Sequence, residues 1–201
     1  MRFSDETHFG WGPQGKIYVI RRPWERFCPD CLVEKEEPAE KDLRRLHCWA
    51  AVGHDFKSEL VWYDVPSNNN GKMTMKVYHD QILEPVVSSW LRAGHSFVLE
   101  EDNDSGHGGK KDNIVTRWKK KNGLDSYFNC PLSPDFVPIE KAWQRPKQAV
   151  RTRPCWEDSI VKELAQEGWD GLQQKSINCW VDQIPQILKD CIEGEGALTG
   201  H

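Results

Sequence analysis

Apolar residues recur at intervals of three and four in several stretches of the chain, and this spacing predicts amphipathic helices. The clearest stretch follows the polar loop at 67–71 and ends at Gly94, and Pro85 is expected to kink it. Its apolar positions are Ile82, Leu83, Val86, Val87, Trp90 and Leu91. The same spacing predicts further helices at 112–121, 139–148, 160–168 and 177–188. We expect Pro185 to interrupt the last of them.

Short apolar runs between turn-forming residues predict strands. They lie at 1–6, 16–21, 46–52, 59–65, 96–100 and 127–128, and the first looks like the end of a strand that has been cut short. Residues 24–45 are charged and contain prolines, so we expect an irregular insertion there. Strands come first and then alternate with helices, an order compatible with an α/β fold whose mixed sheet is flanked by helices. We expect the apolar stripes of the two tail helices to be core contacts.

Composition favours one packed domain of 201 residues with ten tryptophans and 38% apolar residues. No apolar run approaches the roughly 20 residues of a membrane span, and the start of the chain has no secretory signal. The formal net charge is −4, so the chain lacks an overall basic footprint for nucleic acid. Local basic clusters include 117–121 and 145–153, which are either solvated faces or surfaces that hold phosphates.

The chain has seven cysteines, an odd number that suggests reduced thiols inside a cell. Cys28, Cys31, His47 and Cys48 could together supply four zinc ligands. Adjacent His47 and Cys48 would, however, point to opposite faces of a strand. The alternative, which we favour, is that these cysteines are buried or surface thiols.

Three acidic motifs stand at the edges of different predicted elements. Asp5 belongs to the first, at 3–6; Asp102 belongs to the second, at 99–107. Glu140 belongs to the third, Ser-Pro-Asp-Phe-Val-Pro-Ile-Glu-Lys-Ala-Trp, which ends at Trp143. Carboxylate oxygens suit Mg²⁺ or Mn²⁺, and such ions keep positions open for water and phosphate. Acids that converge also repel one another unless a cation neutralises them.

In this order the motifs resemble the catalytic domain of Tc1/mariner-type DDE transposases of the fungal kind. In that family a serine-aspartate-glutamate motif supplies the first metal ligand. An aspartate followed by asparagine and, shortly after, by histidine supplies the second, and an "SPD…PIE…W" block supplies the third. The matching positions are Asp5, Asp102 and Glu140. The spacing between the last two is slightly longer than usual, and Val137 stands where many relatives have asparagine, but neither departure removes a ligand.

The resemblance implies a ribonuclease H-like catalytic domain over 1–150, with a truncated first strand, and a helical extension over 151–201. It further implies two Mg²⁺ or Mn²⁺ ions, hydrolytic nicking followed by strand transfer, and a nuclear location. Since the family's helix-turn-helix modules have no match here, we expect weak, non-specific binding to DNA, and the sequence leaves a homodimer open. The alternative is a catalytically inactive transposon-derived remnant that acts at most as a DNA- or protein-interaction module.

Neighbouring residues leave alternatives within each motif. Glu6 should face away from Asp5, because successive side chains of a strand point to opposite faces. Asp104 is either the second ligand in place of Asp102 or a loop cap that binds backbone amides. His107 could orient a ligand, touch phosphate or simply be exposed. A carboxylate in the first turn of a helix, such as Glu140, is also favoured by the helix dipole without any metal.

Overall fold

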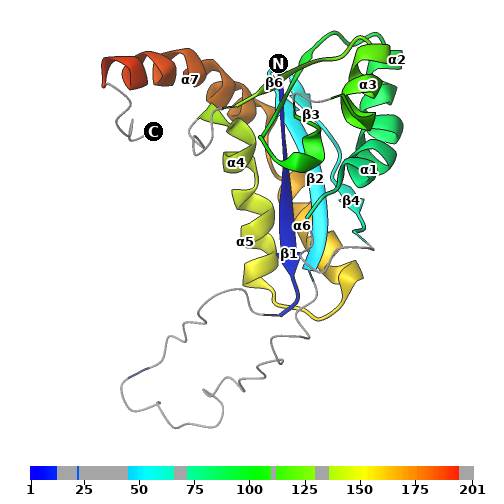
Figure 1. The fold of residues 1–201 in the computed structure, drawn as a ribbon. Coiled ribbons are helices and arrows are strands. Elements are labelled where there is room, and N and C mark those ends of the chain that lie inside the picture. Colours follow the sequence, from blue (N-terminus) through cyan, green and yellow to red (C-terminus); the bar gives the residue numbers. More distant parts are fainter. Residues whose placement is uncertain (13–21, 23–44, 66–71, 110–111, 130–135, 195–201) are drawn as a thin grey trace.

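The computed structural model describes residues 1–12, 22, 45–65, 72–109, 112–129 and 136–194. Its centre is a six-stranded sheet of order β3-β2-β1-β5-β6, with β4 also paired to β2 (Figure 1). The strands are β1 (Arg2–Gly10), β2 (Arg45–Gly53), β3 (Phe56–Lys57), β4 (Val61–Tyr63), β5 (Val98–Glu101) and β6 (Asp125–Phe128). β1 is antiparallel to β2 and parallel to β5, and β5 is parallel to β6, so the sheet is mixed.

The central strand β1 is longer than the sequence predicted. Phe3, Thr7 and Phe9 are buried, and the strand pairs with β2 from Arg2 to Gly10. Its second half was not predicted, because the polar residues Glu6, Thr7 and His8 interrupt the apolar run. On its other edge β1 pairs with β5 only at Arg2 and Phe3. The part of β1 that begins near Asp5 therefore continues past the end of β5.

Four helices pack on one face of the sheet, and the C-terminal part of the last one projects beyond it (Figure 1). They are α4 (Pro138–Ala142), α5 (Gln144–Thr152), α6 (Asp158–Asp170) and α7 (Gln174–Glu193). Trp143, Trp169 and Ile177 from this layer pack with Phe3 and Phe9 of β1 in one apolar core. This packing fixes α4, and with it the third acidic motif, against β1.

The opposite face carries a second apolar core under α1 (Met75–Val77), the π-helical segment η3 (Tyr78–Val87), α2 (Ser88–Arg92) and α3 (Ile114–Lys121). Tyr78, Ile82 and Leu83 are fully buried there. Pro85 lies inside the π-helical segment; a proline has no N–H to donate, and a local change in the hydrogen-bond ladder is the usual response.

Two details of the predicted elements are wrong. The stretch between the predicted strands at 46–52 and 59–65 includes the short strand β3, and only His54 and Asp55 separate β3 from β2. α7 continues through Pro185 for 20 residues instead of being interrupted. Ile177 and Ile187, on either side of the proline, are buried, and this packing offsets the lost backbone hydrogen bond. The predicted strand at 16–21 lies outside the described residues, and the division of the chain at residue 150 stays a prediction.

Candidate active site

Asp5 lies in the middle of β1 and faces the helices that follow the third motif. The Nε1–H of Trp143, a fully buried side chain, donates a hydrogen bond of 3.0 Å to Oδ2 of Asp5. Burial raises the pKa of Asp5 well above its usual value, and the nearby charges of Glu6 and Glu140 raise it further. The first and third predicted ligands are therefore close enough to repel each other, although they come from separate elements.

Glu140 is positioned by the first turn of α4. Pro138 occupies the start of this helix, where its missing N–H costs nothing. Ile139 and Ala142 are buried against the sheet, which leaves the Glu140 side chain on the exposed side. A proline-started turn thus holds this carboxylate beside β1.

Asp102 follows β5 directly, at the carboxyl end of the strand. Its Oδ1 accepts a hydrogen bond of 2.9 Å from the Asp104 backbone N–H and lies 2.7 Å from Nδ1 of His107. The hydrogen bond from His107 lowers the pKa of Asp102, with burial opposing it and the Asp104 amide adding to it. Both contacts engage the same oxygen, and the side chain is 60% exposed. Oδ2 is therefore left for a further ligand.

Asp104 has the second of its predicted roles. Its Oδ1 accepts a 2.8 Å hydrogen bond from the Gly106 N–H and caps the short 3₁₀ helix η4 (Ser105–His107). β5 ends at Glu101, so Asp104 does not extend the strand beside Asp102.

His107 is buried and bound on both sides, so the interpretation of an exposed loop histidine is wrong. Its Nδ1 faces Asp102, and its Nε2 lies 3.0 Å from Oε1 of Glu6, on the opposite face of β1 from Asp5. Burial lowers the pKa of His107, but the charge of Glu6 and the hydrogen bonds to Asp102 and Glu6 outweigh it, so the pKa lies well above its usual value. Since ionised carboxylates only accept hydrogen bonds, both ring nitrogens of a charged His107 donate.

Sequence reasoning missed one further acid in this region, Glu100. It is 2% exposed, lies beside Phe3 in the sheet, and its Oε2 has no hydrogen-bond partner among the described residues. Burial, with the charges of Asp102 and Glu101, raises the pKa of Glu100 to about 8. The available signal was a pair of glutamates inside an otherwise apolar strand.

The donor set suits a divalent cation in its chemistry. Three carboxylates come from β1, the end of β5 and α4, and no lysine, arginine or histidine pairs with Asp5 within the part of the chain that the structure describes. Across those same residues, however, no three acidic, histidine or cysteine side chains are gathered tightly enough to hold one ion. The structure thus places the three carboxylates on adjoining elements, but their side chains do not form a complete metal-binding site in this conformation.

The structure does not support His47 and Cys48 as the second pair of zinc ligands. Cys48 is fully buried in the core, and burial raises the pKa of its thiol far above the usual range. His47 is on the other face, with its Nδ1 3.0 Å from Nδ1 of His8. The two neighbours therefore cannot share one ion. Cys28 and Cys31 lie outside the described residues.

The two basic clusters differ in their placement. Because α3 connects the parallel strands β5 and β6, it runs from the carboxyl end of β5 back toward the amino ends of these strands. The cluster at 117–121 is thus carried away from Asp102, and Lys119 is buried in an ion pair with Glu101. Lys119 therefore belongs neither to a solvated face nor to a surface that holds phosphate.

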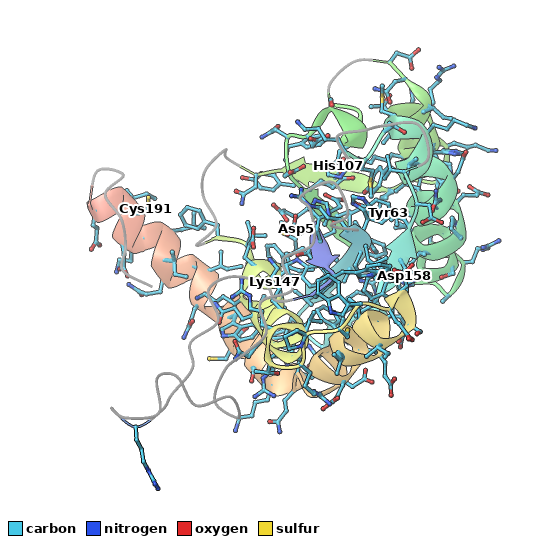
Figure 2. All side chains as sticks on the ribbon, turned by 90° about the horizontal axis from the view of Figure 1, so that it is seen from below. Asp5, Tyr63, His107, Lys147, Asp158 and Cys191 are labelled. Carbon is cyan, nitrogen blue, oxygen red and sulfur yellow. The ribbon has the colours of Figure 1, made fainter. Side chains whose placement is uncertain are left out.

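The cluster on α5 lies closer to the candidate site. Viewed along the strands, Asp5 lies between the helix that carries Lys147 and the segment that carries His107 (Figure 2). The charge of Lys147 also acts on His8 of β1. Arg151 is exposed on the same helix, whereas Arg153 pairs with Glu167 at 2.5 Å. Lys147 and Arg151 remain as candidates for contacts with phosphate.

Comparison with known proteins gives relatives in sequence and in structure, although no family model matches the chain. The chain is 24% identical over 202 residues to the transposase of the transposable element Tcb2 from Caenorhabditis briggsae, and the match covers 99% of this chain and 69% of that protein. It is similar in fold to the Mos1 mariner transposase catalytic domain, with a TM-score of 0.60 and 11% identity over 77% of this chain.

A Mos1 transposase in a paired-end complex with the left transposon end matches over 98% of this chain, with a TM-score of 0.74 and 10% identity. The chain spans 56% of that Mos1 protein. The Mos1 catalytic domain has also been solved with Mn and with Mg. These likenesses confirm the predicted ribonuclease H-like fold, a mixed sheet flanked by helices. Among the described residues no helix is long and apolar enough to cross a membrane.

Proposed function

We propose that the chain is a transposase domain of the Tc1/mariner type that cuts and rejoins DNA with the help of divalent metal ions; its sequence relationship and its fold support this proposal. The observation that carries the proposal is the arrangement of Asp5. This partly buried carboxylate has a raised pKa and a second carboxylate, Glu140, beside it. Such a pair is costly unless a cation neutralises it.

Asp5, Asp102 and Glu140 would hold the ions. Two ions of this kind activate the attacking oxygen and stabilise the leaving one. The protein's own part is to hold the ligands: Trp143 donates to Asp5, and His107 donates to Asp102. The attacking groups would be water for the first cut and a DNA 3′-hydroxyl for the joining step.

The basic side chains of α5 would bind the DNA backbone next to this site. Lys147 lies near His8 on β1, and Arg151 is exposed on the same helix. Contacts of this kind position DNA without reading its sequence. We therefore expect weak, salt-sensitive binding with dissociation constants on the order of 10⁻⁴–10⁻⁶ M. A nuclear location and a homodimer, for which the paired-end complexes of Mos1 are a precedent, belong to the same proposal.

Calorimetric titration with Mn²⁺ tests the metal site. The wild-type domain should bind Mn²⁺, and the triple variant Asp5→Ala/Asp102→Ala/Glu140→Ala should not. Asp104→Asn is the matched control, because it removes one negative charge from the same loop and keeps an oxygen to cap η4. Equal binding by the wild type and the triple variant would refute the metal site.

A further inference from the structure

Glu6 lies next to a proposed metal ligand in sequence, yet its side chain is on the other face of β1. There it meets His107, whose second ring nitrogen meets Asp102. We infer that Glu6 is a positioning residue, which acts through His107 to hold the carboxylate of Asp102 in one orientation at the end of β5. The inference rests on the proposed function, since it assigns a role to the surroundings of the second ligand.

The two contacts of His107 define the orientation of its ring completely. Nε2 lies 3.0 Å from Oε1 of Glu6, and Nδ1 lies 2.7 Å from Oδ1 of Asp102. The side chain of His107 is only 4% exposed, and that of Glu6 is 15% exposed. A ring held at both nitrogens cannot flip without breaking a hydrogen bond in a region that water scarcely reaches.

The backbone that carries His107 is also fixed. Asp104 caps η4 through the Gly106 N–H, and a side chain at Gly106 would come within 2.6 Å of the Met73 carbonyl oxygen. Gly108 follows with a φ of 87°, a conformation that favours glycine. His107 is therefore delivered to Glu6 by a turn with little freedom.

Buried side chains, among them Tyr78 and Glu101, pack around the ring of His107 and support it. The Tyr78 ring meets His107 edge to face, with 4.7 Å between the ring centroids. The hydroxyl of Tyr78 donates a 2.5 Å hydrogen bond to Glu101, which also pairs with the buried Lys119. These side chains lie on the face of the sheet opposite to Asp5, so they can hold His107 without contacting the proposed ions.

The consequence appears at Asp102. His107 and the Asp104 amide both engage Oδ1, and Oδ2 remains available on a side chain that is otherwise 60% exposed. An exposed aspartate without such contacts would sample several rotamers. Because Oδ1 is held in place, Oδ2 of Asp102 also keeps one orientation, and this lowers the entropic cost of binding an ion. Partners of this kind, one step removed from the metal, typically change metal affinity by about 10–100-fold.

Four test variants and one control separate this role from general damage. Glu6→Ala and His107→Ala each remove one link, and the double variant removes both. Glu6→Gln keeps the shape and one acceptor oxygen. Glu59→Ala is the control, because it removes the same charge from an exposed side chain between β3 and β4. Mn²⁺ affinity is measured by calorimetry for each, beside Asp102→Ala.

We expect Glu6→Ala and His107→Ala to weaken Mn²⁺ binding about 10–100-fold. The double variant should be no worse than either single variant, because the two residues act in series. Glu6→Gln should recover part of the affinity, and Glu59→Ala should match the wild type. Wild-type affinity in Glu6→Ala, together with lost binding in Asp102→Ala, would overturn this inference and leave the proposed function standing.

A second readout needs no metal. In nitrogen–proton NMR spectra of the metal-free domain, the ring N–H protons of His107 should be protected from exchange with water. Glu6→Ala should expose the Nε2 proton to exchange, and Glu6→Gln should retain its protection. Unchanged ring signals in Glu6→Ala would overturn the inference. If the wild type binds no Mn²⁺, the proposed function fails, and these spectra alone decide whether Glu6 orients His107.

Discussion

The indole N–H of Trp143 donates a 3.0 Å hydrogen bond to the Asp5 carboxylate, and this bond joins the last residue of the third acidic motif to the first predicted ligand. The contact spans 138 positions of the chain. The tryptophan of that motif therefore has a structural role, because it holds a partly buried carboxylate that has no basic partner in the part of the chain that the structure describes.

Replacing Trp143 by phenylalanine should therefore destabilise the domain in a pH-dependent way. The variant keeps an aromatic ring against Trp169 but removes the donor to Asp5. The hydrogen bond from Trp143 favours the ionised form of Asp5, so the loss in the free energy of unfolding should grow with pH and approach about 1.5–3 kcal/mol once Asp5 is ionised. At pH 4 the loss should be smaller, because Asp5, whose pKa is raised, is then largely protonated.

Trp169→Phe is the matched control for that experiment. Its indole N–H donates to the backbone oxygen of Ser58 at 2.8 Å, a neutral acceptor whose charge does not change with pH. Urea unfolding of both variants at the two pH values is the measurement. An equal pH dependence of the two losses would argue against an ionised Asp5 as the partner of Trp143.

Asp5→Asn should stabilise the metal-free domain at pH 8. The pKa of Asp5 is raised in the folded state, so folding favours the protonated form, and stability falls as the pH rises above the unfolded value near 3.8. Asparagine carries no charge at any pH, so the variant should escape this fall in stability. The gain should be smaller at pH 4 and should disappear only well below pH 3.8, where the carboxyl is protonated in both states.

Calorimetric melting of the wild type and Asp5→Asn at pH 4 and pH 8 measures this effect. Added Mn²⁺ should raise the melting temperature of the wild type at pH 8 and leave that of the variant unchanged. A variant that melts below the wild type at pH 8 would show that Asp5 is satisfied without a cation.

The neighbours Glu100 and Glu101 should respond oppositely to the same substitution. Glu100 has an unpartnered oxygen among the described residues and a pKa of about 8, so its protonated form is favoured in the fold and stability should fall between about pH 4.5 and pH 8. Glu100→Gln should remove that fall. Glu101→Gln breaks a buried pair with Lys119, which should cost about 3–5 kcal/mol. Urea unfolding across this pH range distinguishes the two, and equal effects would contradict the partner assignments.

Binding to DNA should strengthen as the pH falls from about 7.5 to 5.5. Burial lowers the pKa of His8 and of His47, and the charge of Arg45 lowers both further, although Asp64 opposes this at His47. Both rings are therefore mainly neutral at pH 7. A DNA phosphate near Lys147 would favour their charged forms and take up protons on binding.

Fluorescence anisotropy with one duplex over this pH range measures the effect. The double variant His8→Gln/His47→Gln should flatten the pH dependence. His54→Gln, in the turn at the other end of β2, should leave it unchanged. A wild-type affinity that does not vary with pH would mean that DNA does not approach this end of β1.

Local sequence patterns predicted most of the fold. The strands β2 and β5 and helices α3 and α6 follow from apolar spacing and turn residues, because each buries one regular face. The second half of β1 was missed, since its buried positions alternate with polar residues that serve the candidate site. Pro185 misled the prediction of α7, because tertiary packing outweighed a local propensity.

The candidate site was predictable only in its acids. Asp5, Asp102 and Glu140 are marked by their motifs, and the opposite orientation of Glu6 follows from strand alternation. The meeting of Glu6 with His107, 101 positions away, depends on how β1 and β5 pair, which no local spacing reveals. Glu100 was missed for a related reason: its burial depends on what covers the sheet, not on its neighbours in sequence.

Metal-dependent nicking of a supercoiled plasmid tests the central claim most directly. The wild-type domain should nick DNA with Mg²⁺ or Mn²⁺ and lose this activity when the metal is chelated. Asp102→Asn should reduce nicking to background, whereas Asp104→Asn, which removes the same charge and keeps the cap of η4, should retain it. No nicking by the wild type, or undiminished nicking by Asp102→Asn, would contradict the account; the first result would favour a catalytically inactive remnant.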